Sequence, residues 1–511
     1  MEVQWTGGSC VDGRAETKGG FVMGNDWLGE ALLLIDGELV EAEGGARYPN
    51  INPATEEVIG SGADASPGDI DRAIAAARRA FDETNWSVDV ELRVRALHQL
   101  QEGLMKQAEP IRKLTMAEVG LPSMYLDNIG FDGPVSGIGW FADLLAHYNF
   151  SEDHGVANVM GGESHRWTER EAVGVVGAIT PWNQPTMVNL AKLGPALAAG
   201  NAVVLKGAPD TPWCASALAK VIAEHTEIPP GIVNVITSAA NDRGQELVID
   251  PRVDLITFTG STATGRRIMS LGGETVKKCF LELGGKSANI VLEDADFAAG
   301  VAASATMVLV HGGQGCSTLT RLLLPRSRFE EGVELAAQIM SSIPYGDPAD
   351  PGNVMGPLIS ARQRDRVEGM VERAKSAGAK PVIGGRRPPQ FERGFYYEPT
   401  LIADLGEDAE IVRDEVFGPV LTVLPFEDED DAVRMANNSI YGLSAAVFSG
   451  DRDRSKRVAS RLRAGTVMVD GGMYYNCDVP FGGYKQSGLG RENGRAGFEE
   501  YLEIKTLAEP A

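Results

Sequence analysis

The sequence predicts an α/β fold with a Rossmann-like parallel sheet, a second α/β domain and a small β element. Its 511 residues exceed what one hydrophobic core usually holds, so at least two domains are expected. From residue 172 onward, apolar and β-branched runs alternate with stretches of helical periodicity. Strands that lack polar alternation and are separated by helices indicate a parallel sheet covered on both faces.

The N-terminal part of the chain predicts a tail, a strand pair and a helix. Residues 1–30 are glycine-rich and aperiodic, which is typical of a loose tail. The stretch INPATEEVIG at 51–60 favours a strand, a turn and a second strand. A helix should follow, because Ser66 suits the N-cap, Pro67 suits the first helical position and Asp69 lies three residues after the cap.

The region from 172 to 273 alternates between predicted strands and predicted helices. The strands are AVGVVGAIT at 172–180, NAVVLKG at 201–207, IVNVIT at 232–237 and LITFTG at 255–260. The helices are 185–200, which Gly200 closes, 212–225 and 261–273. In parallel sheets of this kind, ligands bind at the carboxyl ends of the strands. Cys279, shortly after this region, is expected to be a core residue of a further strand.

Two other segments predict contact with a partner subunit. Residues 156–171 favour a hairpin that turns at Gly161 and Gly162, and residues 501–507 alternate like an edge strand. A lone hairpin is marginally stable in water, so both segments point to an oligomer. The predicted division of the chain is a dinucleotide-binding domain at 31–153 and 173–285, a catalytic domain at 286–480, and an oligomerisation hairpin and strand at 154–172 and 495–511.

Composition excludes several classes of partner. The net charge of -24 disfavours nucleic acid and anionic membranes. The longest apolar run, near 301–310, is about half of a membrane span. The N-terminus lacks a basic segment followed by an apolar one, so no signal peptide is expected. The five cysteines show no CxxC spacing, which predicts a reducing, cytoplasmic location without disulfides or a metal site.

Polar and glycine-rich motifs follow the predicted strands in a distinctive order. They are TPWN at 180–183, KGAPDTPW at 206–213, FTGSTATG at 258–265, LELGGK at 281–286, HGGQGCST at 311–318, DEVFGPV at 414–420 and PFGGYKQSGLGRE at 480–492. In this order and spacing, from about residue 32 onward, the chain closely resembles the aldehyde dehydrogenase superfamily. The resemblance implies oxidation of an aldehyde to a carboxylic acid with NAD or NADP, through a cysteine thiohemiacetal and a thioester.

The resemblance also implies three catalytic residues. Cys316 would be the nucleophile, and the glycines around it would let substrate and cofactor approach closely. The amide of Asn183 would stabilise the oxyanion together with the Cys316 backbone N–H. Glu282 would be the general base that activates water. Taken singly, Cys316 could be a small core thiol, Asn183 a helix cap and Glu282 a solvated side chain.

A second set of residues is assigned to cofactor binding by the same resemblance. Lys206 would hydrogen-bond the adenosine ribose, Glu415 would hold the nicotinamide ribose and Phe417 would pack beside the nicotinamide. Gly260 and Gly265 would let a helix N-terminus face the pyrophosphate. The complete set is Trp182, Lys206, Pro209, Gly260, Ser261, Gly265, Gly284, Glu415 and Phe417, and no metal ligand is expected.

The sequence departs from the pattern of the family in ways that bear on cofactor and substrate. Much of the family has a ribose-binding glutamate where this chain has Pro209, so both NAD and NADP are expected to be accepted. Gln184 replaces a common aromatic residue. No lysine or arginine occurs in 311–320 or 470–480, which favours a bulky or apolar aldehyde. Tyr474 or Tyr475 would line its pocket, or serve only as packing anchors.

Three other interpretations of the sequence compete. In a CoA-acylating aldehyde dehydrogenase CoA would take the acyl group, and Glu282 would not be needed. A non-catalytic protein could retain the fold, although it would not require Asn183, Glu282 and Cys316 together. A cysteine hydrolase would need a histidine near the thiol, and His311 is close in sequence. As partners we expect a small-molecule aldehyde and a second copy of the chain, in a homodimer or homotetramer.

Overall fold

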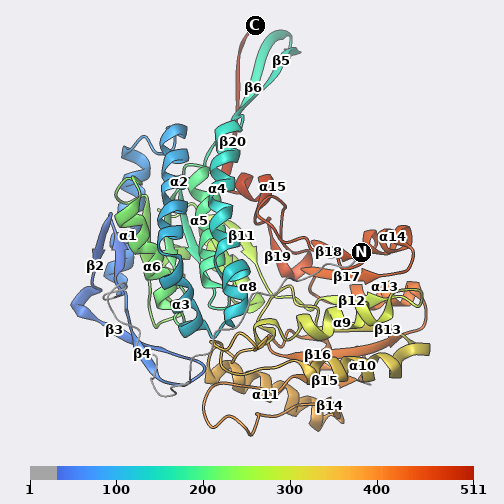
Figure 1. The fold of residues 1–511 in the computed structure, drawn as a ribbon. Coiled ribbons are helices and arrows are strands. Elements are labelled where there is room, and N and C mark those ends of the chain that lie inside the picture. Colours follow the sequence, from blue (N-terminus) through green and yellow to red (C-terminus); the bar gives the residue numbers. More distant parts are fainter. Residues whose placement is uncertain (1–30, 404) are drawn as a thin grey trace, which may run out of the picture.

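The structure, a computed structural model, describes residues 31–403 and 405–511. The predicted loose tail at 1–30 lies outside the described residues. Two lobes, each built on a largely parallel sheet, lie side by side, and an arm projects from the first lobe (Figure 1). This arrangement confirms the predicted α/β fold with parallel sheets. None of the helices in the described part of the chain combines the length and apolar character needed to cross a bilayer.

The first lobe contains an eight-stranded sheet in the order β19-β11-β10-β7-β8-β9-β1-β2. Its central strands β11, β10, β7, β8 and β9 are mutually parallel. The strands are β1 (Leu33–Ile35), β2 (Glu38–Val40), β7 (Val175–Ile179), β8 (Ala202–Lys206), β9 (Val233–Ile236), β10 (Leu255–Thr259), β11 (Lys278–Glu282) and β19 (Gly488–Leu489). The predicted strands of this lobe are therefore present, including the one that carries the partly buried Cys279.

Helices cover both faces of this sheet, as the apolar character of its strands requires. One face is covered by α5 and α6, with α2, α3 and α4 packed outside them, and the other by α1, α7 and α8. The helices are α1 (Pro67–Glu83), α2 (Val90–Lys106), α3 (Ala108–Val119), α4 (Asp132–His147), α5 (Pro185–Ala198), α6 (Pro212–His225), α7 (Arg243–Ile249) and α8 (Thr262–Gly272).

Local sequence signals account for most of these elements. Ser66 caps α1 by accepting a hydrogen bond from the Asp69 backbone N–H, and the Asp69 carboxylate accepts from the Ser66 backbone N–H at 2.8 Å. Strands β3 (Arg47–Ile51) and β4 (Val58–Ala63) form the predicted pair. The β1–β2 hairpin and α7 were not predicted, because each is too short to show a period.

The second lobe contains a seven-stranded sheet in the order β14-β15-β16-β13-β12-β17-β18. Only the β14–β15 pair is antiparallel. One apolar core lies on each face, one under α9 and α10 and the other under α11, α12, α13 and α14. The strands are β12 (Ala288–Val291), β13 (Arg321–Pro325), β14 (Pro381–Ile383), β15 (Thr400–Ala403), β16 (Val420–Phe426), β17 (Ser444–Phe448) and β18 (Thr466–Val469). The helices are α9 (Phe297–Met307), α10 (Phe329–Ser342), α11 (Ala361–Ser376), α12 (Glu410–Arg413), α13 (Glu429–Asn437) and α14 (Arg452–Ser460).

The arm is a three-stranded antiparallel sheet in which β6 (Gly162–Ala172) lies between β5 (Ser151–Val159) and β20 (Leu502–Pro510). The predicted hairpin and terminal strand therefore pair with each other within one chain (Figure 1). The turn lies at Met160 and Gly161, both with positive φ, rather than at Gly161 and Gly162. The start of the predicted 495–511 segment belongs to α15 (Gly494–Glu499), which packs on α5 in the first lobe.

Candidate active site

The carboxyl ends of the parallel strands of the first lobe bring the predicted residues to one edge. Strand β7 pairs with β8 on one side and with β10 on the other. The chain leaves β7 toward β8 and β9, and then returns to β10 and β11, so the strand order reverses between β7 and β10. Such a reversal is where α/β sheets bind their ligands. Asn183, Lys206, Ser261 and Glu282 each stand at or just after one of these strand ends.

The Cys316 loop from the second lobe closes over this edge. The loop runs from the 3₁₀ turn Val310–Gly313 to β13, and Gly312 and Gly313 have φ of 62° and 71°. A Cβ atom on Gly313 would lie 2.1 Å from the carbonyl oxygen of Gly418, so only glycine fits there. A Cβ atom on Gly285 would lie 2.3 Å from the carbonyl oxygen of Cys316. The half-buried cysteine is thus held between two segments of main chain.

Asn183 contacts the same loop. Its Nδ2 donates to the carbonyl oxygen of Gln314 at 2.8 Å, and the side chain is buried. Asn183 does not cap α5, because the N-cap position is Gln184, which makes no side-chain capping bond. The interpretation of Asn183 as a helix cap is therefore wrong. Its amide instead contacts Gln314, which lies two residues before Cys316 in the loop.

Glu282 ends β11 as a buried carboxyl group without a hydrogen-bond partner. The residue is 3% exposed, and neither carboxylate oxygen has a partner. Its Oε1 lies against Gly482, where a Cβ atom would approach to 2.6 Å. Burial raises the pKa of Glu282 well above its usual value, and the nearby Glu492 carboxylate raises it further. The solvated-residue interpretation is wrong, because Glu282 is buried, and its raised pKa means that it retains a proton to higher pH than an exposed glutamate.

The Cys316 thiol is surrounded by several carboxyl groups that affect its pKa. Burial raises its pKa, and Glu415, Glu282 and Glu492 add to the effect. A thiol in this environment stays protonated until a base removes its proton.

Glu415 reaches this site from the second lobe. Its Oε1 accepts a hydrogen bond from the Gly285 backbone N–H at 2.9 Å. A Cβ atom on Gly284 would lie 2.4 Å from Oε2, so the carboxylate rests directly on the glycine pair. Burial raises the pKa of Glu415 to about 7, although the Gly285 bond opposes the shift.

Two aromatic residues face each other across the lobes. Trp182 follows β7, and its ring makes an edge-to-face contact with Phe417, with ring centroids 5.4 Å apart. Phe417 has a φ of 58°, and its carbonyl oxygen accepts a hydrogen bond from Gln363 Nε2 at 2.7 Å. The left-handed backbone of Phe417 costs energy, and the hydrogen bond from Gln363 helps to offset it. The Phe417 ring is therefore held in a defined place.

Lys206 ends β8 as a buried ammonium group. Its Nζ donates to the carbonyl oxygen of Gly207 at 3.3 Å, and burial lowers its pKa to about 8 despite the Asp242 and Asp64 carboxylates. Pro209 follows in the loop to α6. The next residue, Asp210, forms an ion pair of 3.3 Å with Arg362 at the start of α11.

The turn from β10 into α8 carries Gly260, Ser261 and Gly265. Ser261 is the N-cap of α8 and accepts a hydrogen bond from the Thr264 backbone N–H at 3.2 Å. The Gly260 backbone N–H donates to the carbonyl oxygen of Glu282 at 3.0 Å, which ties this turn to the end of β11. A Cβ atom on Gly265 would lie 2.5 Å from the Leu283 side chain, so glycine permits close packing of helix and strand here.

The two tyrosines of the 470–480 loop differ. Tyr474 stacks on Phe481, and its hydroxyl lies 2.9 Å from Ser444 Oγ, so it is a packing anchor. Tyr475 keeps 38% of its surface exposed. Its ring makes an edge-to-face contact with Phe481, with ring centroids 5.5 Å apart, and burial raises the pKa of its hydroxyl. Both tyrosines therefore pack against Phe481, and Tyr475 keeps exposed surface that a substrate could contact.

A buried ion pair near Glu282 was not predicted. Lys192 in α5 lies 2.9 Å from Glu492, and both side chains are almost fully buried. Lys192 also donates to Thr257 Oγ1 at 3.1 Å. Lys192 interrupts an apolar helix, which is the one signal that could have drawn attention to it. Glu492 is far away in sequence, and nothing local marks it.

His311 does not act as the partner that a cysteine hydrolase requires. Burial lowers the pKa of its imidazole to about 4, so the ring is neutral. Neither ring nitrogen has a hydrogen-bond partner in the structure, and the Cys316 thiol is therefore not bonded to it. Nor does any group of three or more His, Cys, Asp or Glu side chains with the geometry of a metal site occur among residues 31–403 and 405–511.

Fold and site together define a class of protein. A doubly covered parallel sheet offers a dinucleotide cleft, and a thiol, an amide and a buried carboxyl group from different segments converge on its edge. Such an arrangement is typical of nicotinamide-dependent oxidoreductases. Comparison with known proteins specifies the family.

The model of the aldehyde dehydrogenase family matches residues 39–507. A 3-succinoylsemialdehyde-pyridine dehydrogenase from a Pseudomonas species is 39% identical over 478 residues, which is 93% of this chain and 97% of the relative. Betaine aldehyde dehydrogenase from Bacillus subtilis is 39% identical over 485 residues, covering 93% and 96%. A solved structure of a cysteine-to-alanine mutant of an aldehyde dehydrogenase from Pseudomonas syringae, in complex with NAD⁺ and octanal, has a TM-score of 0.88 at 37% identity, covering 93% and 96%.

The chain therefore belongs to the aldehyde dehydrogenase family. It is an NAD(P)-dependent aldehyde dehydrogenase that oxidises aldehydes.

Proposed function

We propose that this enzyme converts a bulky or apolar aldehyde to the carboxylic acid through a covalent intermediate on Cys316, with water as the final acyl acceptor. The observation that carries the proposal is the convergence of Cys316, Asn183 and the unpartnered Glu282 at one sheet edge. The three residues come from segments far apart in the chain, and a structural role would not require this combination.

Cys316 supplies the nucleophile. Its Sγ forms a bond to the carbonyl carbon, and the aldehyde oxygen becomes an oxyanion. Asn183 Nδ2 and the Cys316 backbone N–H donate hydrogen bonds to that oxygen. Because burial, and next the surrounding carboxylates, raise the pKa of the thiol, it must lose its proton as the bond forms. That proton is released to water, so the Glu282 carboxylate remains available for the hydrolysis step.

The residues of the cleft fit a dinucleotide. Ser261 and the N-terminus of α8 suit the pyrophosphate, Lys206 and Glu415 suit the two riboses, and Trp182 with Phe417 suits the nicotinamide. Thr259 Oγ1, at the end of β10, is buried without a partner, as expected of a group that a ligand would engage. When bound, NAD⁺ or NADP⁺ accepts the hydride that leaves the substrate carbon.

Glu282 then serves hydrolysis. The thioester on Cys316 is attacked by water, the Glu282 carboxylate takes the proton of that water, and the carboxylic acid leaves as the thiolate is restored. A CoA-acylating enzyme has no need of a base at this position. The buried, unpartnered carboxyl group therefore supports the hydrolytic alternative.

The substrate class is inferred from the mouth of the site. The 470–480 loop exposes Met473, Tyr475 and Val479, with Met473 80% exposed, and carries no lysine or arginine. An apolar rim without a cation suits an apolar aldehyde better than one with its own carboxylate. The Pseudomonas syringae relative, solved with octanal, is consistent with this class.

Cofactor preference is inferred from the loop after β8. Pro209 offers no carboxylate to the ribose hydroxyls and none to repel a 2′-phosphate. The carboxylate of the next residue, Asp210, could have bound the ribose instead, but it is paired with Arg362 at 3.3 Å. We infer that NAD⁺ and NADP⁺ are both accepted.

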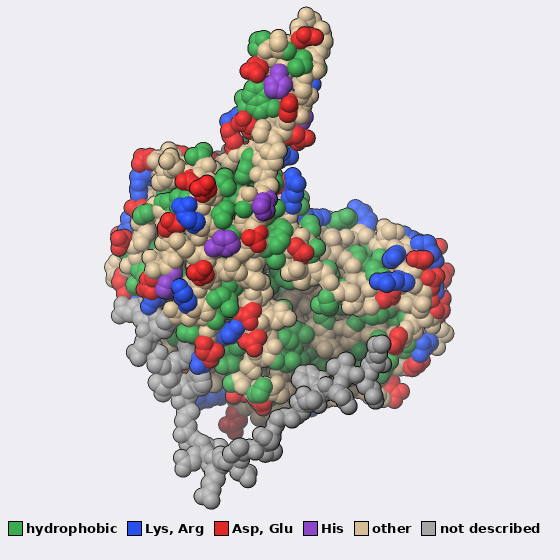
Figure 2. Space-filling model, turned by 45° about the horizontal axis from the view of Figure 1, so that its top comes forward, with side chains coloured by type: hydrophobic (Ala, Val, Ile, Leu, Met, Phe, Trp, Pro, Cys, Tyr) green, Lys and Arg blue, Asp and Glu red, His purple; other side chains and the backbone are tan. Residues whose placement is uncertain are grey.

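Assembly and location are inferred from the arm and the cysteines. The β5–β6–β20 arm stands away from the body and exposes apolar side chains, among them Val156, Met160 and Ile504 (Figure 2). Such a surface suits a second copy of the chain, and we infer a homodimer or homotetramer. The cysteines of the described residues are all free, which fits a cytoplasmic location.

The test is Cys316→Ala, with Cys279→Ala as the matched control. Aldehydes of increasing size are offered with NAD⁺ and with NADP⁺, and nicotinamide absorbance is recorded. Cys316→Ala should lower kcat by far more than about a hundredfold while retaining cofactor binding, measured by fluorescence quenching. Cys279→Ala should remain active. Retention of more than about a hundredth of kcat in Cys316→Ala would show that the nucleophile is assigned wrongly.

A further inference from the structure

A cavity in the second lobe is lined by cations. It lies where β12, β13 and β17 begin, beside the end of α13. Its empty volume of about 290 Å³ includes space open to solvent, and its narrow interior has room for one water molecule or one monatomic ion. Lys286, Ser287 and Arg321 line it in the buried part, and Arg463 lines it as an exposed residue.

The buried cations have no carboxylate partner. Lys286 Nζ donates to the Ile411 carbonyl oxygen at 2.8 Å. The Arg321 guanidinium donates to three main-chain carbonyl oxygens at 2.8 to 3.0 Å. An ammonium has three N–H donors and a guanidinium has five, so both groups retain unused donors. Within the described residues, no aspartate or glutamate lies in ion-pair distance of Lys286, Arg321, Arg463 or the neighbouring Lys485.

The main-chain carbonyl groups offset only part of the positive charge of Lys286 and Arg321. The end of α13 contributes roughly half a negative charge, and Lys485 also donates there, to the Asn437 and Ser439 carbonyl oxygens. Burial, and next the Arg321 charge, lower the pKa of Lys286 to about 7, although Glu415 and Asp414 act in the opposite direction. Buried cations are ordinarily paired with an anion, but the atoms that directly contact Lys286 and Arg321 here are main-chain carbonyl oxygens.

Ser287 adds a neutral donor. Its hydroxyl is 3% exposed by residue and has no hydrogen-bond partner in the structure. A buried hydroxyl without a protein partner is uncommon, and it is available to a bound water molecule or ion. The Ser287 side chain borders the same cavity as the two cations.

We propose that this cavity binds a small monovalent inorganic anion of chloride size, held by Lys286, Arg321 and Ser287, with Arg463 at its mouth. The narrow interior excludes phosphate and carboxylate ligands, which need room for several oxygens. The site is separate from the residues to which the proposed function assigns chemistry.

The anion also connects to the catalytic edge. Lys286 directly follows Gly284 and Gly285, the pair on which the Glu415 carboxylate rests and which contacts the Cys316 carbonyl oxygen. Arg321 Nε holds the Lys286 carbonyl oxygen at 2.8 Å. An anion that fixes Lys286 and Arg321 would therefore stiffen the turn beneath the active site.

Bromide is the probe, because it replaces chloride and scatters anomalously. Crystals of the full chain grown without halide are soaked in about 0.1 M sodium bromide, and we expect an anomalous peak beside Ser287 Oγ and Lys286 Nζ. In solution, sodium bromide or chloride should raise the apparent Tm by at least about 2 °C over sodium methanesulfonate at equal ionic strength. Water in the cavity, or a peak that appears only at molar bromide as an adventitious ion, would overturn the proposal.

Variants separate the site from general salt effects. Ser287→Ala removes the hydroxyl and Arg463→Gln removes the cation at the mouth, and each should abolish most of the halide-specific rise in Tm. Arg452→Gln, an exposed arginine in α14 outside the cavity lining, should retain it. Arg463 is exposed, so its variant should fold even if Ser287→Ala does not. If sodium bromide or chloride raises the apparent Tm equally in all variants, the proposed anion site is wrong. This conclusion does not depend on the activity of the enzyme.

Discussion

Glu282 shows how burial sets the chemistry of a single residue. Its carboxyl group is buried without a partner beside Glu492, so its pKa is raised and it holds a proton more readily than an exposed glutamate. A general base works only when deprotonated, so hydrolysis of the thioester should become faster as pH rises through that elevated pKa. Lys192, 2.9 Å from Glu492, opposes the shift and keeps the carboxylate form accessible.

The substitution Glu282→Gln tests this role. The glutamine keeps the shape of the side chain but cannot accept a proton, so the thioester should accumulate on Cys316. Steady-state turnover should fall by about 10²- to 10⁴-fold, while one equivalent of reduced nicotinamide still forms per site. Intact-mass spectrometry after mixing with aldehyde and cofactor should show the acyl adduct. Turnover equal to wild type would remove Glu282 from the mechanism.

Pro209 is the residue at which cofactor choice can be altered. In Pro209→Glu, a carboxylate would accept hydrogen bonds from the ribose hydroxyls and repel a 2′-phosphate. A charge-assisted hydrogen bond of roughly 1.5–3 kcal/mol predicts about ten- to a hundredfold tighter NAD⁺ binding, and NADP⁺ use should nearly disappear. Equilibrium binding of both cofactors is the measurement.

Asp210→Asn is the control for this prediction. Because Asp210 is paired with Arg362, neutralising it should change the ratio of the two affinities little. If the wild-type enzyme already rejects NADP⁺ by more than about a thousandfold, another group discriminates and the role given to Pro209 fails.

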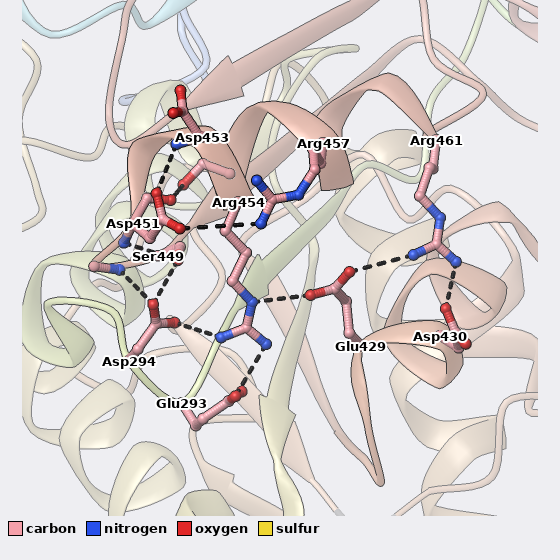
Figure 3. Close-up of polar contacts among 12 residues, drawn as sticks. Glu293, Asp294, Glu429, Asp430, Ser449, Asp451, Asp453, Arg454, Arg457 and Arg461 are labelled. Carbon is pink, nitrogen blue, oxygen red and sulfur yellow. Dashed lines mark hydrogen bonds and ion pairs between the residues drawn. The ribbon is translucent and has the colours of Figure 1, made fainter.

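At the scale of elements, charged side chains fix the helices that surround the second sheet. Figure 3 shows Arg454 of α14 pointing toward Glu293, Asp294 and Glu429, and each ion pair measures 2.9 Å. Glu429 also pairs with Arg461, so the N-terminus of α13 is tied to two positions of α14. The opposite end of α13 is held by Arg321 and Lys485. The helix that borders the cation-lined cavity is therefore anchored at both ends.

Removal of Arg454 should loosen this anchorage. In Arg454→Met, three carboxylates lose a partner that is only 21% exposed. Partly exposed pairs contribute about 0.2–1 kcal/mol each, so the apparent Tm of this 511-residue chain should fall by about 0.6–3 °C. Arg457→Met on the same helix is the control, because Arg457 is 67% exposed and has one pair at 3.9 Å. Similar losses for both variants would show that the Arg454 network is not what holds the helix.

At the scale of the whole molecule, the arm is the part that a single chain does not bury. Its three strands extend from the first lobe, and hydrophobic, acidic and histidine side chains lie together on its surface (Figure 2). Both outer strands, β5 and β20, pair on one side only within the described chain. Open strand edges with exposed apolar residues favour association with another chain.

Assembly can be tested on this surface. Light scattering at micromolar concentration should give the mass of a dimer or a dimer of dimers. The double variant Val156→Lys with Ile504→Lys places charge on the exposed apolar positions of the arm, and it should shift the protein toward the monomer. Val88→Lys, at an apolar position on the body that is even more exposed, should leave the mass unchanged. A monomeric wild-type protein would refute the proposal.

The sequence by itself predicted the parallel sheet of the first lobe, a second α/β domain, the capped helix α1 and the strand ends at which most of the proposed site residues lie. It could do so because strand ends are marked locally, as by Gly200 before β8, and because the carboxyl ends of parallel strands meet at one edge. The order of the motifs around Asn183, Glu282 and Cys316 was sufficient to indicate the family.

Only the tertiary structure decided which side chains are partners, because partnership depends on contacts between distant segments. The pairing of Lys192 with Glu492 and of Asp210 with Arg362 joins residues with no shared local signal. Tyr474 and Tyr475 are adjacent and identical in type, yet the Tyr474 hydroxyl contacts Ser444, whereas Tyr475 keeps 38% of its surface exposed. The burial that raises the pKa of Glu282 likewise exists only in the folded protein, since desolvation is a property of the folded surroundings. The same holds for the cavity where Lys286, Arg321 and Ser287 come together.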